Sequence, residues 1–173
     1  MTHTQATWWR RAVGWIGKAS IGLLLGVGVL AAGGLLYEAL ATDADLRQFP
    51  PPGQLVDVGG YRLHIHCTGT GSPTVILESA LPAGSPVWAW VQPAVSRTSR
   101  VCVYDRAGES WSDIGPKPRD ATRVATELHT LLANAGVDGP FVLVGHSFGG
   151  LYTRVFASQY RDQVVGMVLI DAS

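Results

Sequence analysis

The sequence predicts an α/β protein with a mostly parallel β-sheet, preceded by a single membrane-spanning helix. Three observations support this fold class. An uncharged apolar run lies near the start of the chain, short apolar strands alternate with helical segments from residue 74 onward, and a G-x-S-x-G pentapeptide separates a strand from a helix at residues 145–149. Strands that alternate with helices build parallel sheets through right-handed crossovers, so most of the chain is expected to form one such sheet.

The composition suits one globular domain with an additional apolar segment. The chain has 173 residues, a formal net charge of zero at pH 7 and 47% hydrophobic residues. These values differ from those of a disordered chain, and no basic patch indicates a nucleic-acid partner. The sequence does not indicate an oligomeric state.

The apolar run Ala19–Tyr37 contains 19 uncharged residues, enough to cross a hydrocarbon core as a helix. Basic residues precede it and acidic residues follow it: Arg10, Arg11 and Lys18 on one side, Glu38, Asp43 and Asp45 on the other. The positive-inside rule therefore predicts a cytoplasmic basic segment at residues 1–18, a transmembrane signal anchor at 19–41 and an extracytoplasmic remainder. A cleaved signal peptide is the alternative, because Ala39-Leu40-Ala41 offers a small-residue cleavage pattern. Both alternatives place the remainder of the chain outside the cytoplasm.

A polar stretch at residues 42–54 ends in Pro50-Pro51-Pro52 and is expected to form an extended linker to a domain at residues 55–173. The domain begins with alternating polar and apolar residues on both sides of Gly59-Gly60, which predicts a β-hairpin. His64 and His66 share one face of its second strand. We expect that face to be solvated, with metal ligation as the less favoured alternative.

Four further strands and two helical segments follow. The strands are predicted at residues 74–77, 100–104, 141–144 and 164–170, each as an apolar run typical of a buried parallel strand. A short helical segment is expected at 87–95, and a helix with apolar residues at 124, 128, 131 and 135 begins after the N-cap Asp120 and stops at Gly136.

The pentapeptide Gly145-His146-Ser147-Phe148-Gly149 is the main functional signal. A serine on so tight a strand-to-helix turn has strained backbone angles, and its neighbours two residues away on each side come too close for side chains. Glycines at 145 and 149 meet that requirement. The turn exposes the Ser147 hydroxyl at the start of a helix, where unpaired N–H groups favour a developing negative charge.

This stretch resembles the nucleophile elbow of the α/β-hydrolase superfamily, and Asp105-Arg106-Ala107-Gly108 resembles the D-R-x-G that follows its fourth strand. The resemblance covers about residues 54–173 and implies helices on both faces of the sheet. It implies a serine hydrolase acting on a small-molecule acyl ester, with no metal or organic cofactor and with Ser147 as nucleophile. Asp105 and Arg106 are expected to tie loops together without taking part in the chemistry.

The resemblance also implies where the other site residues lie. The oxyanion would bind the backbone N–H groups of Leu81 and Phe148, although Ser79-Ala80 stands where the family usually has His-Gly. Asp171, after the sixth strand, is a candidate for the acid.

In the family the second strand runs antiparallel beside the fourth. Cys67 closes the second predicted strand and Cys102 lies in the fourth, so the resemblance implies that the two cysteines meet. In an exported protein they would form a disulfide; two separate thiols are the alternative.

The family's catalytic histidine follows the acid along the chain, but this sequence has no histidine after His146. The expected fold is therefore incomplete at the C-terminus. The chain is either the product of a truncated gene model or a natural remnant of a hydrolase. Two functions follow: a serine hydrolase that is inactive unless an acid and a histidine are supplied, or a membrane-anchored, non-catalytic remnant that binds a partner.

Overall fold

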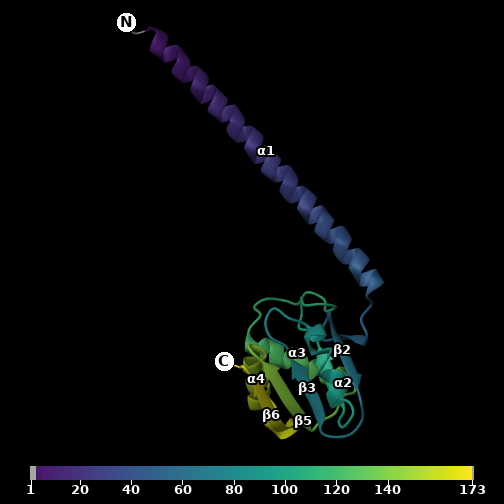
Figure 1. The fold of residues 1–173 in the computed structure, drawn as a ribbon. Coiled ribbons are helices and arrows are strands. Elements are labelled where there is room, and N and C mark those ends of the chain that lie inside the picture. The colour runs from purple at the N-terminus through teal and green to yellow at the C-terminus, as the bar shows by residue number, and fades with distance from the viewer. Residues whose placement is uncertain (1–2, 173) are drawn as a thin grey trace. The chain divides into compact units, whose positions relative to one another are not determined.

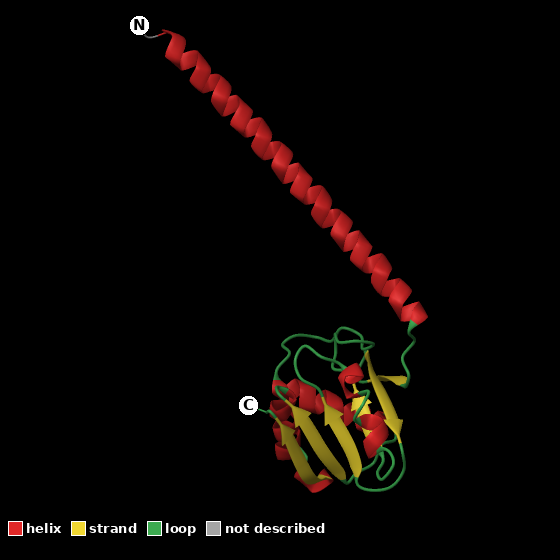
Figure 2. Cartoon of the chain, viewed as in Figure 1, coloured by secondary structure: helices red, strands yellow, loops and turns green. Residues whose placement is uncertain are grey.

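A computed structural model describes residues 3–172 (Figures 1 and 2). Residues 1, 2 and 173, and the side chains at 3–12, 14, 16, 17, 19, 43 and 46, which include Arg10, Arg11 and Asp43, lie outside its description. The chain divides into two units between Pro50 and Pro51. The first consists mainly of one helix, and the second holds the whole sheet.

Helix α1 spans His3–Gln48. Within it, Ser20–Thr42 is long and apolar enough to cross a membrane, with a mean hydropathy of 2.0, and none of its residues is buried in the structure. The structure corrects the expected linker, because residues 42–48 continue the helix. This segment contains neither glycine nor proline, and the helix ends just before Pro50, where a proline disfavours helical angles in the residue before it. Only residues 49–53 remain as a non-helical connection to the first strand.

The second unit contains a six-stranded sheet in the order β1-β2-β4-β3-β5-β6. Its strands are β1 Gln54–Asp57, β2 Arg62–Thr68, β3 Thr74–Glu78, β4 Val101–Tyr104, β5 Phe141–His146 and β6 Val164–Ile170. Strands β4, β3, β5 and β6 run parallel to one another, whereas β2 is antiparallel to both β1 and β4. The predicted mostly parallel sheet is confirmed, including the antiparallel contact between the second and fourth strands.

The β1–β2 hairpin turns at Gly59-Gly60, as the alternation predicted. Both glycines have positive φ angles, and the Asp57 carboxylate accepts hydrogen bonds from both of their N–H groups. Asp57 pairs with Arg62 at the last position of the ladder. A residue with a side chain would be strained at either glycine position.

Helices cover both faces of the sheet. Helix α3 spans Ala121–Asn134 and begins as predicted, because the Asp120 side chain accepts the N–H of Arg123. Helix α4, Gly149–Gln159, packs beside it. The predicted helical segment at 87–95 consists of a 3-10 helix, Ser85–Trp88, and a short helix α2, Gln92–Val95. A second 3-10 turn, Arg161–Gln163, precedes β6.

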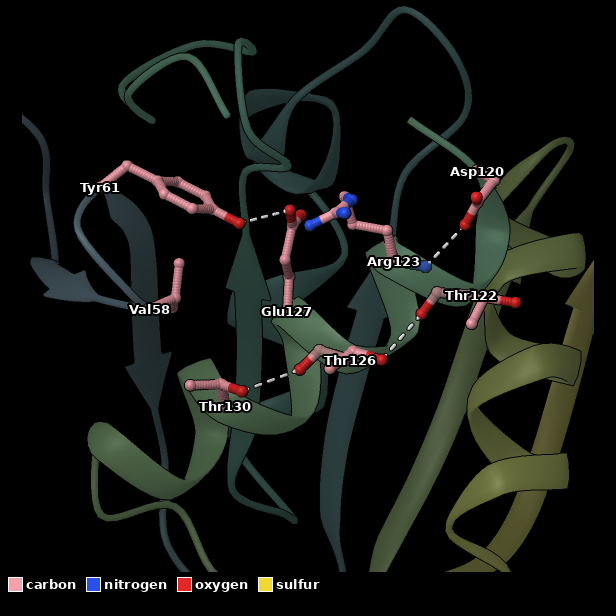
Figure 3. A pocket seen from close by; sticks show the side chains of 8 residues that line it. All are labelled: Val58, Tyr61, Asp120, Thr122, Arg123, Thr126, Glu127 and Thr130. Atoms are coloured by element: carbon pink, nitrogen blue, oxygen red, sulfur yellow. Dashed lines mark hydrogen bonds between the residues drawn. The ribbon is translucent and has the colours of Figure 1, made fainter. Parts of the chain in front are cut away.

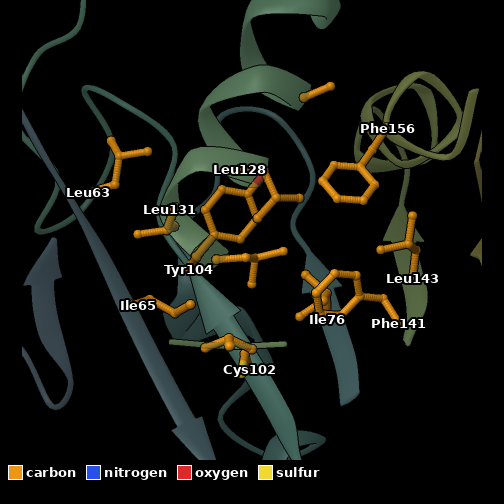
Figure 4. Close-up of a cluster of buried hydrophobic side chains, with 13 residues drawn as sticks. Leu63, Ile65, Ile76, Cys102, Tyr104, Leu128, Leu131, Phe141, Leu143 and Phe156 are labelled. Atoms are coloured by element: carbon orange, nitrogen blue, oxygen red, sulfur yellow. The ribbon is translucent and has the colours of Figure 1, made fainter. Parts of the chain in front are cut away.

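Alternate residues of the strands enter two cores. One lies between the sheet and helices α3 and α4 (Figure 4), and the buried side chains that Figure 4 labels are Leu63, Ile65, Ile76, Cys102, Tyr104, Leu128, Leu131, Phe141, Leu143 and Phe156. The other, smaller core holds Leu77, Val101, Val103 and Trp88. Burial on both faces explains why these strands are continuous apolar runs in the sequence.

Candidate active site

Ser147 occupies a sharp turn between strand β5 and helix α4. Its φ angle is +52°, in the left-handed region that residues with a side chain rarely adopt. Two backbone hydrogen bonds hold the turn: the N–H of Ser147 donates to the carbonyl of Ile170 at 3.0 Å, and the N–H of Gly150 donates to the carbonyl of Ser147 at 2.9 Å. Strain of this kind at a strand-to-helix turn is typical of a nucleophile elbow.

The two glycines that flank the turn at Ser147 lie in crowded positions. A Cβ atom on Gly145 would stand 2.7 Å from the Cα atom of Gly150, and one on Gly149 would stand 2.6 Å from the carbonyl oxygen of Glu78. Both distances are shorter than a non-bonded carbon contact allows. Backbone geometry therefore explains the glycine on each side of Ser147.

Leu81 and Phe148 lie at the carboxyl edge of the sheet. Leu81 follows β3, Phe148 directly follows Ser147, and both residues are about half exposed. Within the described part of the chain, the backbone N–H of neither residue donates a hydrogen bond. Free N–H groups at this edge are what an oxyanion hole requires.

Asp171 directly follows β6, whose last residue, Ile170, lies opposite His146 in the parallel ladder. Asp171 is exposed and has a φ angle of +45°. The acid candidate therefore stands at the same edge of the sheet as Ser147.

Two histidines of the second unit pack against aromatic rings. The ring of His146 packs edge-on against Trp88 at a centroid distance of 6.4 Å, and the ring of His129 stacks on Tyr160 at 4.0 Å. Across residues 51–172, no imidazole forms a hydrogen bond with Ser147. The described residues thus bring Ser147, the N–H groups of Leu81 and Phe148, and Asp171 to one edge of the sheet, without an imidazole bonded to Ser147.

The expectation of a solvated His64 is wrong. Its side chain is fully buried, and Nδ1 lies 2.8 Å from Oδ2 of Asp105. The Ser112 hydroxyl accepts the backbone N–H of His64, and the Trp111 ring lies 5.0 Å from the imidazole. Alternation shows which residues share a strand face, but not that a loop from residue 105 onward covers that face.

Sequence reasoning missed a buried charged cluster around Glu78, the last residue of β3. Its carboxylate accepts hydrogen bonds from the Tyr104 hydroxyl and the Arg106 guanidinium, and it is almost completely buried. Burial raises the pKa of Glu78 to about 7, although Arg106 and Tyr104 oppose the shift. A charged residue that directly continues the apolar run 74–77 was the available signal, since such a residue is rarely buried without a partner.

The expectation that Asp105 and Arg106 tie loops together is confirmed. Asp105 accepts the N–H of Ser85 as well as binding His64. Arg106 donates to the carbonyls of Ser79, Ala80 and Ala83. These contacts connect the segments that follow β3 and β4.

The second unit has two pockets of similar volume, and only one of them is lined by a predicted site residue. A pocket of about 360 Å³ is lined by residues that include Leu81, Pro82, Arg106 and Tyr152. Another, of about 350 Å³, lies on helix α3 beside the hairpin (Figure 3), and none of the predicted site residues lines it. In Figure 3 its polar groups bind one another, for example the Tyr61 hydroxyl and the Glu127 carboxylate.

Comparisons with known proteins agree with this geometry. The family model described as the alpha/beta hydrolase fold matches residues 73–173, more than half of the chain. An uncharacterized vacuolar membrane protein of Saccharomyces cerevisiae is 32% identical over 130 residues, which cover 65% of this chain and 20% of that protein. Among solved structures, the epoxide hydrolase CorEH matches with a TM-score of 0.64 and 28% identity, covering 69% of this chain and 41% of the other. A thermophilic esterase from Thermogutta terrifontis matches with a TM-score of 0.63 and 28% identity, covering 69% and 45%.

The chain spans less than half of the length of each of these proteins. The matched part includes β3 to β6 and the turn at Ser147. With its sheet order, its strained serine and a family model that matches most of the sheet, the chain belongs to the alpha/beta hydrolase fold family.

Proposed function

We propose that this chain carries the nucleophile of a serine hydrolase that cleaves small-molecule acyl esters. The observation that supports this most is the conformation of Ser147, at φ +52° between β5 and α4, with crowded glycines two residues away on each side. The similarity to an esterase structure favours an ester substrate. Such a strained turn is of no use to a structural serine, whereas it exposes a nucleophile.

In the proposed reaction, Oγ of Ser147 attacks the acyl carbon while its proton passes to a base. The carbonyl π electrons move onto oxygen, and the N–H groups of Leu81 and Phe148 stabilise that oxyanion. Collapse of the intermediate expels the alcohol with the transferred proton, and water then releases the acid from Ser147. Asp171 would orient the base, which must be an imidazole supplied from outside the described residues.

A fluorophosphonate probe tests this proposal on the protein isolated from its own membranes. We expect covalent labelling of the peptide that contains Ser147, identified by mass spectrometry, and complete loss of labelling in Ser147→Ala, because phosphonylation requires an activated hydroxyl. Ser158→Ala, on the same helix but outside the elbow, is the control and should label normally.

A second function is favoured by the lack of an imidazole at Ser147 among the described residues. In that case the chain is a membrane-anchored, non-catalytic module that binds a partner with the same scaffold. A folded wild-type sample that remains unlabelled would favour this function over the hydrolase.

We further propose a single-pass membrane protein with its hydrolase domain outside the cytoplasm. The apolar segment Ser20–Thr42, the basic residues before it and the acidic residues after it support this orientation, and a relative described as a vacuolar membrane protein supports membrane association. Protease added to intact cells is expected to digest the domain. A domain that is protected until lysis would contradict the orientation.

A further inference from the structure

We infer that Arg106 is a positioning residue for the oxyanion hole: anchored by Glu78, it fixes the peptide group that carries the N–H of Leu81. This inference rests on the proposed hydrolase function. We use the term oxyanion loop for residues 79–83, which follow β3.

The guanidinium of Arg106 holds three carbonyl groups of this loop. Nη1 donates to the carbonyl of Ser79 at 2.8 Å, and Nη2 donates to the carbonyls of Ala80 at 2.8 Å and Ala83 at 3.3 Å. A planar guanidinium presents its N–H groups in a fixed fork, so one side chain sets the course of the whole loop.

The bond to Ala80 has the most direct consequence. The carbonyl of Ala80 and the N–H of Leu81 belong to the same peptide group, which is planar and rigid. When Arg106 fixes the direction of that carbonyl, it also fixes the direction of the Leu81 N–H, which points the opposite way. The positive charge on the carbonyl side also polarises the peptide and strengthens the N–H as a donor.

Arg106 is itself held from three directions. Its side chain is only 5% exposed and forms ion pairs with Glu78 and Glu109. Its guanidinium carbon also lies 5.1 Å from the centre of the Tyr152 ring on helix α4. Because the guanidinium is itself fixed, its hydrogen bonds also fix the position of the oxyanion loop.

Glu78 connects this arrangement to the elbow. It pairs with Gly145 in the β3–β5 ladder, and its carbonyl oxygen and Cγ atom lie within 3.0 Å of the position that a Cβ on Gly149 would occupy. The anchor of Arg106 therefore touches the turn that carries Ser147. One cluster sets both the nucleophile and one oxyanion donor.

Apolar packing does not replace these contacts on the pocket side of the loop. Leu81 and Pro82 line the pocket of about 360 Å³ together with Arg106, and Leu81 is 50% exposed. A loop that borders open space depends on its polar contacts for its position. The three hydrogen bonds of Arg106 supply that restraint together with the backbone bond from the Ala83 N–H to the Ala80 carbonyl and the contacts of the Ser79 hydroxyl.

Arg106→Lys tests the inference, because lysine keeps the charge and loses the fork. In the full-length protein we expect the fluorophosphonate inactivation rate constant to fall about 10- to 100-fold with the apparent affinity for the probe unchanged, since misplaced catalytic groups cost factors of this order. Reduced folding alone would lower the fraction of protein that labels, not the rate constant. Arg119→Lys is the matched control, because Arg119 pairs with the buried Glu127 and lines the same pocket without bonding the oxyanion loop.

Hydrogen exchange of the peptide that covers residues 79–83 gives a second readout that needs no activity. Arg106→Lys should exchange faster there, with helix α4 unchanged, and Arg119→Lys should match the wild type. A wild type that labels, with an unaltered rate constant in Arg106→Lys, would overturn the positioning role alone. An unlabelled wild type would overturn the proposed function. If hydrogen exchange at residues 79–83 is also unaltered in Arg106→Lys, the proposal that Arg106 restrains the oxyanion loop is rejected as well.

Discussion

Replacing Glu78 with alanine is expected to lower the free energy of unfolding by about 3–5 kcal/mol, the usual cost of removing one partner from a buried ion pair. Glu78 is 1% exposed, and its carboxylate is bonded to both Arg106 and Tyr104. Without it, a buried guanidinium and a buried hydroxyl lose a partner. Chemical denaturation of the detergent-solubilised chain would measure the change.

Glu109→Ala is the matched control for this prediction. Glu109 also pairs with Arg106, but its side chain is 16% exposed against 1% for Glu78, so removing it should cost clearly less than removing Glu78. Losses of equal size in the two variants would contradict a special role for Glu78.

The effect of Glu78→Ala should also depend on pH. The pKa of Glu78 is about 7 in the folded protein, above its ordinary value of 4.5, so the folded state binds this proton more tightly than the unfolded chain does. The resulting stability is fully present below the ordinary pKa and is lost as the pH rises through 7. The difference between wild type and variant should therefore shrink from pH 5 to pH 8. A difference that grows over this interval would mean that Arg106, not burial, controls the pKa of Glu78.

The elements that could be predicted from sequence are those whose signals are local. Strand β6 was predicted at its observed bounds. The strand coincides with one apolar run, and polar residues before and after that run mark its two ends in the sequence. The turn at Ser147 was predicted because its glycines are required by contacts between near neighbours, such as Gly145 with Gly150. The order of the strands, in contrast, came from the resemblance to a family and not from the pattern.

The elements that could not be predicted depend on contacts between distant segments. His64 is buried by a loop about 40 residues further along the chain, and Glu78 is bonded to residues 26 and 28 positions away. No periodicity records such contacts. The end of α1 was also misplaced, because polar helix-forming residues after an apolar span fit a linker and a helix equally well until a proline stops the helix.

Removal of the disulfide between Cys67 and Cys102 is expected to lower the free energy of unfolding by about 3–4 kcal/mol, according to a model-dependent chain-entropy estimate. The two cysteines lie opposite each other in the antiparallel β2–β4 pair, and their Sγ atoms are joined in the structure. They are 35 residues apart, so the bond closes a loop that also contains β3 and α2. Opening the loop gives the unfolded chain more conformations, which lowers the relative stability of the fold.

Cys67→Ala separates the bond from other effects of a reductant. Reductant should destabilise the wild type and leave Cys67→Ala unchanged, because the variant has no bond to break. The same bond tests the compartment, since disulfides persist in oxidising environments and are rare in the cytosol. Protein taken from cells and alkylated without reductant should therefore carry no modification at either cysteine. Stoichiometric alkylation of both would reject the disulfide in the cell and remove one support for the extracytoplasmic placement.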